Sequence, residues 1–476
     1  MSEAEDARHG RRAAGVREDA GGGHHVSRRE LIKRSAVVAA GGITLPMLLA
    51  ACGDSSDGGS GSSTAAVPAG RAPRSVLDNA SIRELFPMGG ANDGSGVTLP
   101  TGMLMAMTGT GAFYGKVMSR GAKLAARQIA AMGGTSFPIT IADHKSGDVQ
   151  AGVTGTRKLI TQDKVKTLLT SYGAVTVAIV PLIAQYRVLT LNGGGPDPSQ
   201  VGKPWLYMTR MFAGDDQVAG GLAWLASAYP NVKRLAVVGT SENAVDAQKV
   251  LIPKWWPQLG GGRVVALQET TEAGATDFSN AAARIRSSNA DAVFTFNTGN
   301  DYAYLLKQLR ESGFDGPVLG IEFTEDAQKI AGRYGNTYTF TADYFDSASE
   351  NPFARQFVEA YRAEYGEDPE LYAANYYEAV FIVFELVRRV QEAGEDPTDS
   401  SQLERAIAAD PRFLSVYGGT ASRAGTLVLK PDHTTEKPQG IYSVVNGRPK
   451  LLAETRKVAR DADPRTALLT DNPPAR

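Results

Sequence analysis

The sequence predicts an α/β protein built from two similar lobes joined in series. Short apolar runs rich in strand-forming residues alternate with amphipathic helical segments, and the alternating series restarts once along the chain. Alternation of this kind predicts parallel sheets connected by right-handed crossovers. Once an N-terminal leader is set aside, roughly 380 to 400 residues remain, which is more than one hydrophobic core usually holds.

The chain begins with an expected export signal over residues 1–51. The segment "SRRELIK" at 27–33 precedes an uncharged run that is too short and too rich in glycine to favour a transmembrane helix. A basic start, a modest apolar middle and small residues before a cut point are typical of export signals. The first part resembles a twin-arginine signal, although Leu31 stands where an aromatic residue is commoner; the general export route stays an alternative.

Cys52 is the only cysteine of the chain. A single thiol excludes an intramolecular disulfide and falls short of the roughly four ligands of a structural zinc site. The preceding "LAAC" resembles a bacterial lipobox, which implies that Cys52 becomes the lipidated first residue of the mature chain. The alternative is a secretory signal with an incidental cysteine. We expect 52–97 to hold the lipidated cysteine and a flexible tether, because its Gly- and Ser-rich start buries too little apolar surface to fold.

The first alternating series follows the tether. Its longest helix, 116–132, has apolar residues at helical spacing and stops at Gly133-Gly134. The expected order is strand 102–107, helix 116–132, strand 137–143, helix 149–162, strand 164–170, helix 175–186 and strand 188–192.

The second series repeats this pattern. Its expected order is strand 233–239, helix 246–259, strand 263–267, helix 278–287, strand 291–297, helix 302–311 and strand 316–321. A long helical block at 351–393 and a helix at 402–408 follow. The segments 425–430 and 440–452 are expected to form a strand pair, and the latter contains an Asn-Gly turn signal. A charged tail from Thr455 is expected to stay loose.

Several function classes are disfavoured by composition and motifs. The formal net charge of −1, with no basic stripe, argues against a nucleic-acid partner. No motif of a serine hydrolase, a phosphate-binding loop or a zinc protease is present, and we expect no metal. After the leader only His144 and His433 remain, both in polar turn-like contexts, and we expect both to be solvated surface residues.

One loop raises an enzymatic alternative. Gly109, Gly111 and Gly115 form a G-x-G-x-x-x-G run between a strand and a helix, and the next strand ends at Asp143. This is a loose dinucleotide-binding pattern in which Asp143 would bind a ribose. An exported dinucleotide-dependent oxidoreductase is therefore an alternative, but the spacing also suits any tight turn before a helix.

The same loop belongs to a broader resemblance. The segments "MTGTGAFYG", "GAKLAARQIAAMGG", "IADHKSGD", "TRKLITQDKV", "ATDFSNAAARIRSSNADAVF", "LLKQLRESGFDGPVLG" and "YAANYYEAV" occur in this order. From about residue 98 to 450 the chain resembles type I solute-binding proteins of ABC importers, in the branched-chain amino acid and amide group.

The resemblance implies a two-lobed clamshell with three interlobe crossovers, which closes on a small polar solute by a hinge motion. The implied boundaries are 98–214 plus 345–408 for lobe one, 215–344 plus 409–454 for lobe two, and 455–476 for the loose tail. The implied protein is no enzyme and needs no cofactor. Its partners would be the solute, an ABC permease with its ATPase subunits, and the membrane through the lipid anchor at the extracytoplasmic face; a clamshell sensor is a further alternative, and a monomer is expected.

The resemblance also implies site residues. A zwitterionic ligand needs donors for its carboxylate, an acceptor for its ammonium group and a shaped wall. The carboxylate-binding loops match Tyr172-Gly173-Ala174 and Gly194-Gly195-Pro196. Gly173 and Pro196 replace the hydroxyl-bearing residues of the family, so only backbone N–H groups of Gly173, Ala174, Gly194 and Gly195 are left as donors there.

In the second lobe, Glu322 matches the ammonium-binding acid of the family. Tyr114 keeps the aromatic wall of the first loop. Ala244 replaces an expected tyrosine, and Asn297-Thr298 replaces an expected aromatic residue. We therefore expect a small amine- or amide-bearing solute, without a prediction of leucine, isoleucine or valine in particular.

Overall fold

The structure is a computed structural model that describes residues 72–109, 111–210, 215–241, 244–343, 345–437, 439–456 and 458–469. These residues belong to one compact unit. Cys52 and the expected export signal lie outside the described residues. Within the described part of the chain, no helix is long and apolar enough to cross a membrane.

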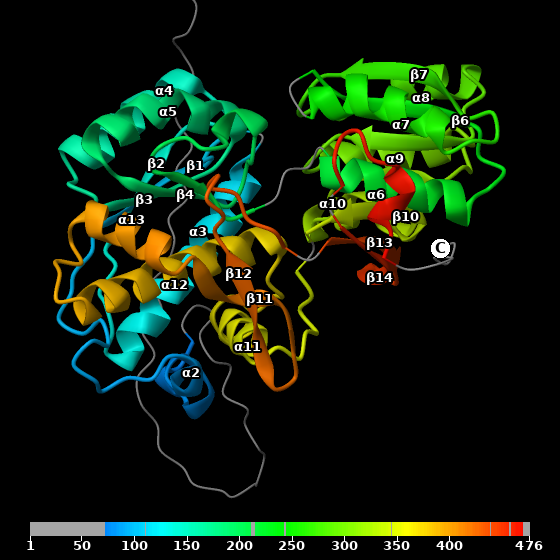
Figure 1. Cartoon of the computed structure of the whole chain (residues 1–476). Coiled ribbons are helices and arrows are strands. Elements are labelled where there is room, and N and C mark those ends of the chain that lie inside the picture. The colour runs from blue at the N-terminus through cyan, green and yellow to red at the C-terminus, as the bar shows by residue number, and fades with distance from the viewer. Residues whose placement is uncertain are drawn as a thin grey trace, which may run out of the picture. The chain divides into compact units, whose positions relative to one another are not determined.

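The first lobe is built on a five-stranded parallel sheet, in the order β2-β1-β3-β4-β5. The strands are β1 (Thr101–Met105), β2 (Ile139–Asp143), β3 (Thr167–Thr170), β4 (Leu189–Asn192) and β5 (Leu206–Met208). The connecting helices are α3 (Ala112–Met132), α4 (Val149–Thr161) and α5 (Gly173–Tyr186). The predicted parallel α/β class is confirmed, and Figure 1 shows these elements next to one another.

The second lobe is built on a seven-stranded sheet, in the order β14-β13-β10-β9-β8-β6-β7. Its parallel strands are β6 (Arg234–Thr240), β7 (Val264–Thr271), β8 (Ala292–Phe296), β9 (Val318–Gly320) and β10 (Tyr338–Ala342). Its helices are α6 (Asp215–Ala228), α7 (Ile252–Gln258), α8 (Ser279–Ser287), α9 (Asp301–Glu311) and α10 (Glu325–Ala331). A π-helical turn, Ala247–Leu251, precedes α7.

An antiparallel hairpin completes the second sheet. It consists of β13 (Gln439–Val445) and β14 (Arg448–Thr455), and β13 pairs with β10. Asn446 and Gly447 at its turn have φ of 52° and 76°. Two successive positive φ values are typical of the turn that matches strand twist in tight hairpins, so the Asn-Gly prediction is confirmed.

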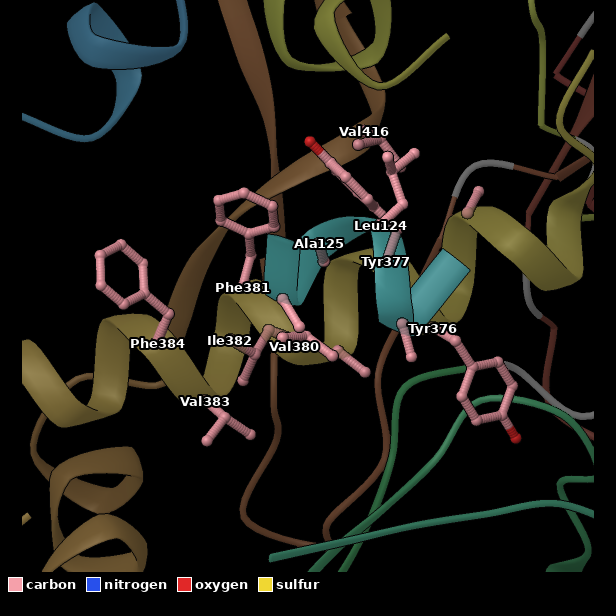
Figure 2. Packing of buried hydrophobic residues seen from close by; sticks show 14 of the residues in the cluster. Leu124, Ala125, Tyr376, Tyr377, Val380, Phe381, Ile382, Val383, Phe384 and Val416 are labelled. Atoms are coloured by element: carbon pink, nitrogen blue, oxygen red, sulfur yellow. The ribbon is translucent and has the colours of Figure 1, made fainter. Parts of the chain in front are cut away.

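The largest hydrophobic cluster lies in the first lobe around α12 (Leu371–Glu392), which is buried on nearly all sides. Figure 2 shows Leu124 and Ala125 of α3 together with Tyr377 and Phe381 of α12. The helices α11 (Pro352–Tyr365) and α13 (Ser400–Ala409) precede and follow α12 in the sequence. A helix that is buried over most of its surface must be covered by other elements, and α12 therefore acts as the centre of this core.

The strand 425–430 was expected to pair with the C-terminal hairpin, and this expectation is wrong. It forms β12 (Arg423–Val428), which pairs with β11 (Arg412–Thr420) in a separate two-stranded sheet. Val416, Tyr417 and Leu427 of these strands are buried in the α12 cluster. The segment expected at 409–430 in lobe two thus packs on the first lobe, because its apolar side chains complete that core.

The expected tether (52–97) and the expected loose tail (455–476) are both partly folded within the described residues. The helices α1 (Arg74–Leu77) and α2 (Ala80–Leu85) lie inside the expected tether, and Leu77, Ile82 and Phe86 are buried in the first core. The predicted loose tail packs on the second core as far as Leu469. Val458 and Ala467 are buried there, and Arg456 N donates to Ala467 O at 2.8 Å.

The chain crosses between the lobes three times: from β5 to α6, from β10 to α11 and from β12 to β13. Each crossover carries a buried charged side chain, namely Arg210, Asp343 and Lys437. Arg210 Nε donates to both carboxylate oxygens of Asp343, at 3.1 and 3.2 Å. Lys437 Nζ donates to Glu378 Oε2 of α12 at 2.7 Å. These ion pairs anchor the crossovers, since an isolated charge at such depth would be strongly unfavourable.

Candidate functional site

Tyr114 is presented by the glycine-containing loop between β1 and α3. Asp143 at the end of β2 holds the start of this loop, because its carboxylate accepts hydrogen bonds from Met107 N, Thr108 N, Lys145 N and Thr108 Oγ1 at 2.9, 3.3, 2.8 and 2.5 Å. Ser146 Oγ accepts from Gly111 N at 2.8 Å. These contacts place Tyr114 in the first turn of α3.

The same contacts do not favour the dinucleotide alternative. A ribose-binding acid needs free carboxylate oxygens for two sugar hydroxyls. Both oxygens of Asp143 are used by its own lobe, with three bonds to Oδ1 and one to Oδ2. The glycine run is therefore explained as a turn that brings α3 into place.

Tyr172 occupies a strained position at the start of α5. Its φ of 65° and ψ of 121° lie in a region that residues with side chains rarely adopt. The neighbouring loop approaches its backbone closely: a Cβ on Gly195 would lie 2.6 Å from Tyr172 N and Cα. Glycine at 195 therefore permits the contact that brings together the two predicted loops, 172–174 and 194–196.

The backbone donors predicted at these loops are in part already used. Gly194 N and Gly195 N both donate to Asn192 Oδ1 at 3.1 Å. Gly173 and Ala174 lie in the first turn of α5, where N–H groups have no partner within the helix. The carboxylate of Asp197 lies beside this turn, since a Cβ on Gly173 would be 3.5 Å from Asp197 Oδ2.

Glu322 follows β9 and is only 2% exposed. Its Oε1 accepts from the Tyr114 hydroxyl at 3.1 Å and from Gly299 N. Its Oε2 accepts from the Tyr372 hydroxyl at 3.1 Å. The structure thus brings Glu322 of the second lobe together with Tyr114 and Tyr372 of the first.

Asn297 and Thr298 lie in the loop after β8 that also supplies Gly299. Asn297 is fully buried; its Oδ1 accepts from Thr295 Oγ1 at 2.9 Å and its Nδ2 donates to Thr271 Oγ1 at 2.7 Å. Thr298 is half-buried. In this arrangement the Asn297 side chain shapes the loop, and a direct ligand contact of either residue stays a prediction.

Three functional candidates, Tyr372, Arg210 and Asp343, are not evident from the sequence. Tyr372 stands at the start of α12 and was quoted only as part of "YAANYYEAV". Its hydroxyl accepts from Arg210 Nη1 at 3.2 Å and donates to Glu322, so a chain of contacts runs from the Asp343–Arg210 pair to Glu322. No local pattern distinguishes Arg210 or Asp343 from ordinary surface charges, because only their burial together reveals them.

The pKa of Glu322 is set chiefly by its burial. Burial raises the pKa of Glu322 above its usual range, while Gly299 N–H, Arg210 and the two tyrosine hydroxyls act in the opposite direction. Burial also raises the pKa of Tyr172 to about 12. The tyrosines are therefore neutral donors at ordinary pH. Two carboxyl groups can change charge here: Glu322, and Glu370, whose pKa is raised to about 8 by burial and by nearby carboxylates that include Glu322.

The prediction for His144 is wrong: it is fully buried. His144 Nε2 lies 3.1 Å from Ser171 Oγ, Nδ1 accepts from Gly147 N at 3.1 Å, and its ring meets Tyr172 edge to face. Burial lowers the pKa of His144. His433 is half-buried and stacks on Tyr207. Both histidines thus support local structure, and among the described residues no group of three or more His, Cys, Asp or Glu could hold a metal ion.

Comparison with known sequences identifies one family of binding proteins. A family described as "Periplasmic binding protein" matches residues 98–448. Leu/Ile/Val-binding protein homolog 8 of Brucella abortus is 24% identical over 285 residues, covering 56% of this chain and 70% of the relative. Homolog 1 of Brucella melitensis is 25% identical over 328 residues, covering 67% and 84%.

Solved structures show the same fold. The substrate-binding protein LivJ of Streptococcus pneumoniae, in complex with isoleucine, superposes with a TM-score of 0.63 at 23% identity, covering 74% of this chain and 98% of that one. A solute-binding protein of an ABC transporter from R. palustris, in complex with benzoate, gives 0.65 at 20% identity, covering 79% and 99%. With a family match over most of its length and this two-sheet α/β architecture, the chain belongs to the periplasmic binding protein family and has its type I fold.

Proposed function

We propose that this chain is the extracytoplasmic substrate-binding subunit of an ABC importer. It binds one small amine- or amide-bearing solute between its lobes and delivers it to a permease with its ATPase subunits, without catalysing a reaction. The protein acts as a monomer, anchored to the membrane through a lipid on Cys52. Family membership and the names of the relatives support the transport role.

The observation that carries the proposal is the environment of Glu322. A carboxylate at 2% exposure faces tyrosine hydroxyls from the other lobe, at the meeting point of the β1, β8 and β9 loops. Loops at the carboxyl ends of parallel strands are the usual place for ligands in α/β proteins. Glu322 Oε2 accepts a single hydrogen bond, from Tyr372, among the described residues, so it keeps capacity for an ammonium or amide N–H group of a ligand.

A thermal-shift screen of the full chain tests this function. Amino acids, amides, polyamines, aromatic acids and nicotinamide dinucleotides are compared at equal concentration. A solute present at a hundredfold excess over its Kd stabilises the folded state by about 2.7 kcal/mol, which raises Tm by a few degrees. We expect shifts with amine or amide solutes. A shift with a dinucleotide alone contradicts the proposal.

A further inference from the structure

The loops that would bind a ligand carboxylate carry features that oppose one. Gly173 and Pro196 carry no side-chain donor, and the amides of Gly194 and Gly195 are used by Asn192 Oδ1 at 3.1 Å. Amides that already donate to an internal carbonyl oxygen have to lose that bond before they bind a ligand. The second loop therefore offers a carboxylate no free donor of the predicted kind.

The start of α5 lies beside an acidic side chain of the protein itself. Its first-turn N–H groups and positive end would attract an anion. Asp197 lies beside that turn: its Cβ and Oδ2 would lie 3.2 and 3.5 Å from a Cβ on Gly173, while its Oδ1 accepts from the backbone N and the hydroxyl of Ser199. A ligand carboxylate at α5 would thus meet a negative charge at short range, and like charges in a partly buried site repel strongly.

The charges around Glu322 add up to a negative site. Arg210 is the cation of this region, and its Nε donates to both oxygens of Asp343 at 3.1 and 3.2 Å. The pair is neutral as a unit, with side-chain exposures of 9% and 2%. When ionised, Glu322 leaves one negative charge among Glu322, Arg210 and Asp343, and the nearby Glu370, whose pKa burial raises to about 8, adds a second titratable carboxyl but no positive charge. This balance favours a ligand that carries a positive charge.

The walls of the site suit the same ligand. The ring of Tyr114 meets the ring of Tyr372 at 76°, with centroids 5.0 Å apart, and the ring of Tyr172 at 78°, with centroids 6.3 Å apart. In such edge-to-face pairs the edge of one ring covers part of the face of the other. The guanidinium carbon of Arg210 also lies over the Tyr372 ring, 4.9 Å from its centroid, so a cation of the chain itself already covers one face of Tyr372. Aromatic faces beside a carboxylate attract alkylammonium groups through the ring quadrupole.

We propose that the solute is a cationic alkylamine that lacks a carboxylate, held by Glu322 and the three tyrosines, and that Asp197 excludes amino acids. This inference rests on the proposed function and narrows it. It assigns Asp197 as a specificity-determining residue and separates this chain from proteins that bind zwitterions. The tyrosine hydroxyls keep Glu322 oriented toward the ammonium group.

The test uses ligands that share a hydrocarbon skeleton but differ in charge. Leucine, 3-methylbutylamine and 4-methylpentanoate form one set; phenylalanine, 2-phenylethylamine and 3-phenylpropanoate form the other. Binding to the full chain is measured by isothermal titration calorimetry at fixed pH and ionic strength. We expect at least one amine to bind about tenfold or more tightly than its amino acid. We expect its carboxylate counterpart not to bind.

Two variants check the cause of this preference. Asp197→Asn keeps a side-chain oxygen that can accept the hydrogen bond from Ser199 N, but it removes the negative charge beside α5. The ratio of amine affinity to amino-acid affinity should therefore fall by about tenfold. Asp148→Asn is the matched control, because Asp148 likewise accepts from a backbone N–H at a helix start, that of Ala151 at 2.9 Å, but at α4. The control should keep the wild-type preference.

The outcomes separate the two proposals. Amino acids that bind as tightly as their amines, with binding lost in Glu322→Gln, overturn the inference and leave the proposed function standing. Carboxylates that bind alone, with affinity unchanged in Glu322→Gln, overturn both. Failure of both amines to bind the wild-type chain also contradicts the inference, as does an Asp197→Asn variant with undiminished discrimination.

Discussion

Arg210 and Asp343 lie 133 positions apart in the sequence, yet the Arg210 guanidinium donates to both oxygens of the Asp343 carboxylate. The two residues belong to two different interlobe crossovers. Arg210 also donates to Tyr372, which donates to Glu322. The geometry therefore connects the segments between the lobes with the proposed ligand acceptor through direct contacts.

We expect Arg210→Met to lower the free energy of unfolding by about 3 to 5 kcal/mol, because Asp343 would be left as an unpaired buried charge. Asp343→Leu should have a comparable effect. The double variant Arg210→Met/Asp343→Leu should be less destabilised than the sum of the single variants. Urea denaturation of the four proteins measures the coupling; additive effects contradict a direct ion pair.

Glu322→Gln should weaken binding of an amine solute by about 2 to 5 kcal/mol, since the uncharged amide no longer complements a buried cation. Glu325→Gln, which changes an exposed carboxylate three positions away, is the matched control and should bind normally. Calorimetric titration with the solute found in the screen gives both affinities. Full affinity in Glu322→Gln would place this residue outside the site.

Amine affinity should depend on pH through Glu322. Burial raises the pKa of Glu322 in the ligand-free protein, and a bound cation would lower it. Affinity should therefore decrease as pH falls through the ligand-free pKa of Glu322 and level off above it, with proton release on binding within that range. Titration in buffers of different ionisation enthalpy measures the released protons. The Glu322→Gln variant should lack this proton release.

Ile82→Ala tests whether the segment before β1 belongs to the folded core. Ile82 is fully buried in the first cluster, so its truncation should lower the free energy of unfolding by about 2 to 5 kcal/mol. Arg74→Ala, at the exposed start of α1, is the control and should change stability little. Chemical denaturation compares the variants. An Ile82→Ala variant with unchanged stability would favour a flexible tether in this segment.

Cys52→Ser tests the proposed lipid anchor, which lies outside the described residues. Without a thiol no lipid can be attached, so the variant should leave the membrane fraction or accumulate as uncut precursor. Cell fractionation and the size of the chain on a gel report both effects. Membrane association that persists in a fully processed variant contradicts lipidation.

Local sequence features determined much of the secondary structure. Apolar periodicity located most strands and helices, and Asn446-Gly447 identified the final hairpin, because turn chemistry and burial patterns act over a few residues. Apolar periodicity did not locate the strands β5, β10 and β11. It also placed 425–430 in the wrong sheet, since several edges can accept a short apolar strand until the rest of the core is assembled.

Both the sequence and the tertiary structure were needed to identify the candidate site. Glu322, Tyr114 and Tyr172 followed from a resemblance in the sequence, and the structure brings Glu322 and Tyr114 within hydrogen-bonding distance. The use of the Gly194 and Gly195 amides by Asn192, and the burial of His144, were not visible in any motif. A side chain's partners depend on what packs around it rather than on its neighbours along the chain.

The sequence by itself determined the α/β class, the family resemblance and the candidate acceptor, because these depend on local propensity and on the order of motifs. Only the tertiary structure decided which charges are paired, which amides are already used, and that the described segments before β1 and after β14 are packed. Arg210 with Asp343 and Gly173 beside Asp197 show the reason: their interactions arise from proximity created by the fold, which the sequence pattern does not encode locally.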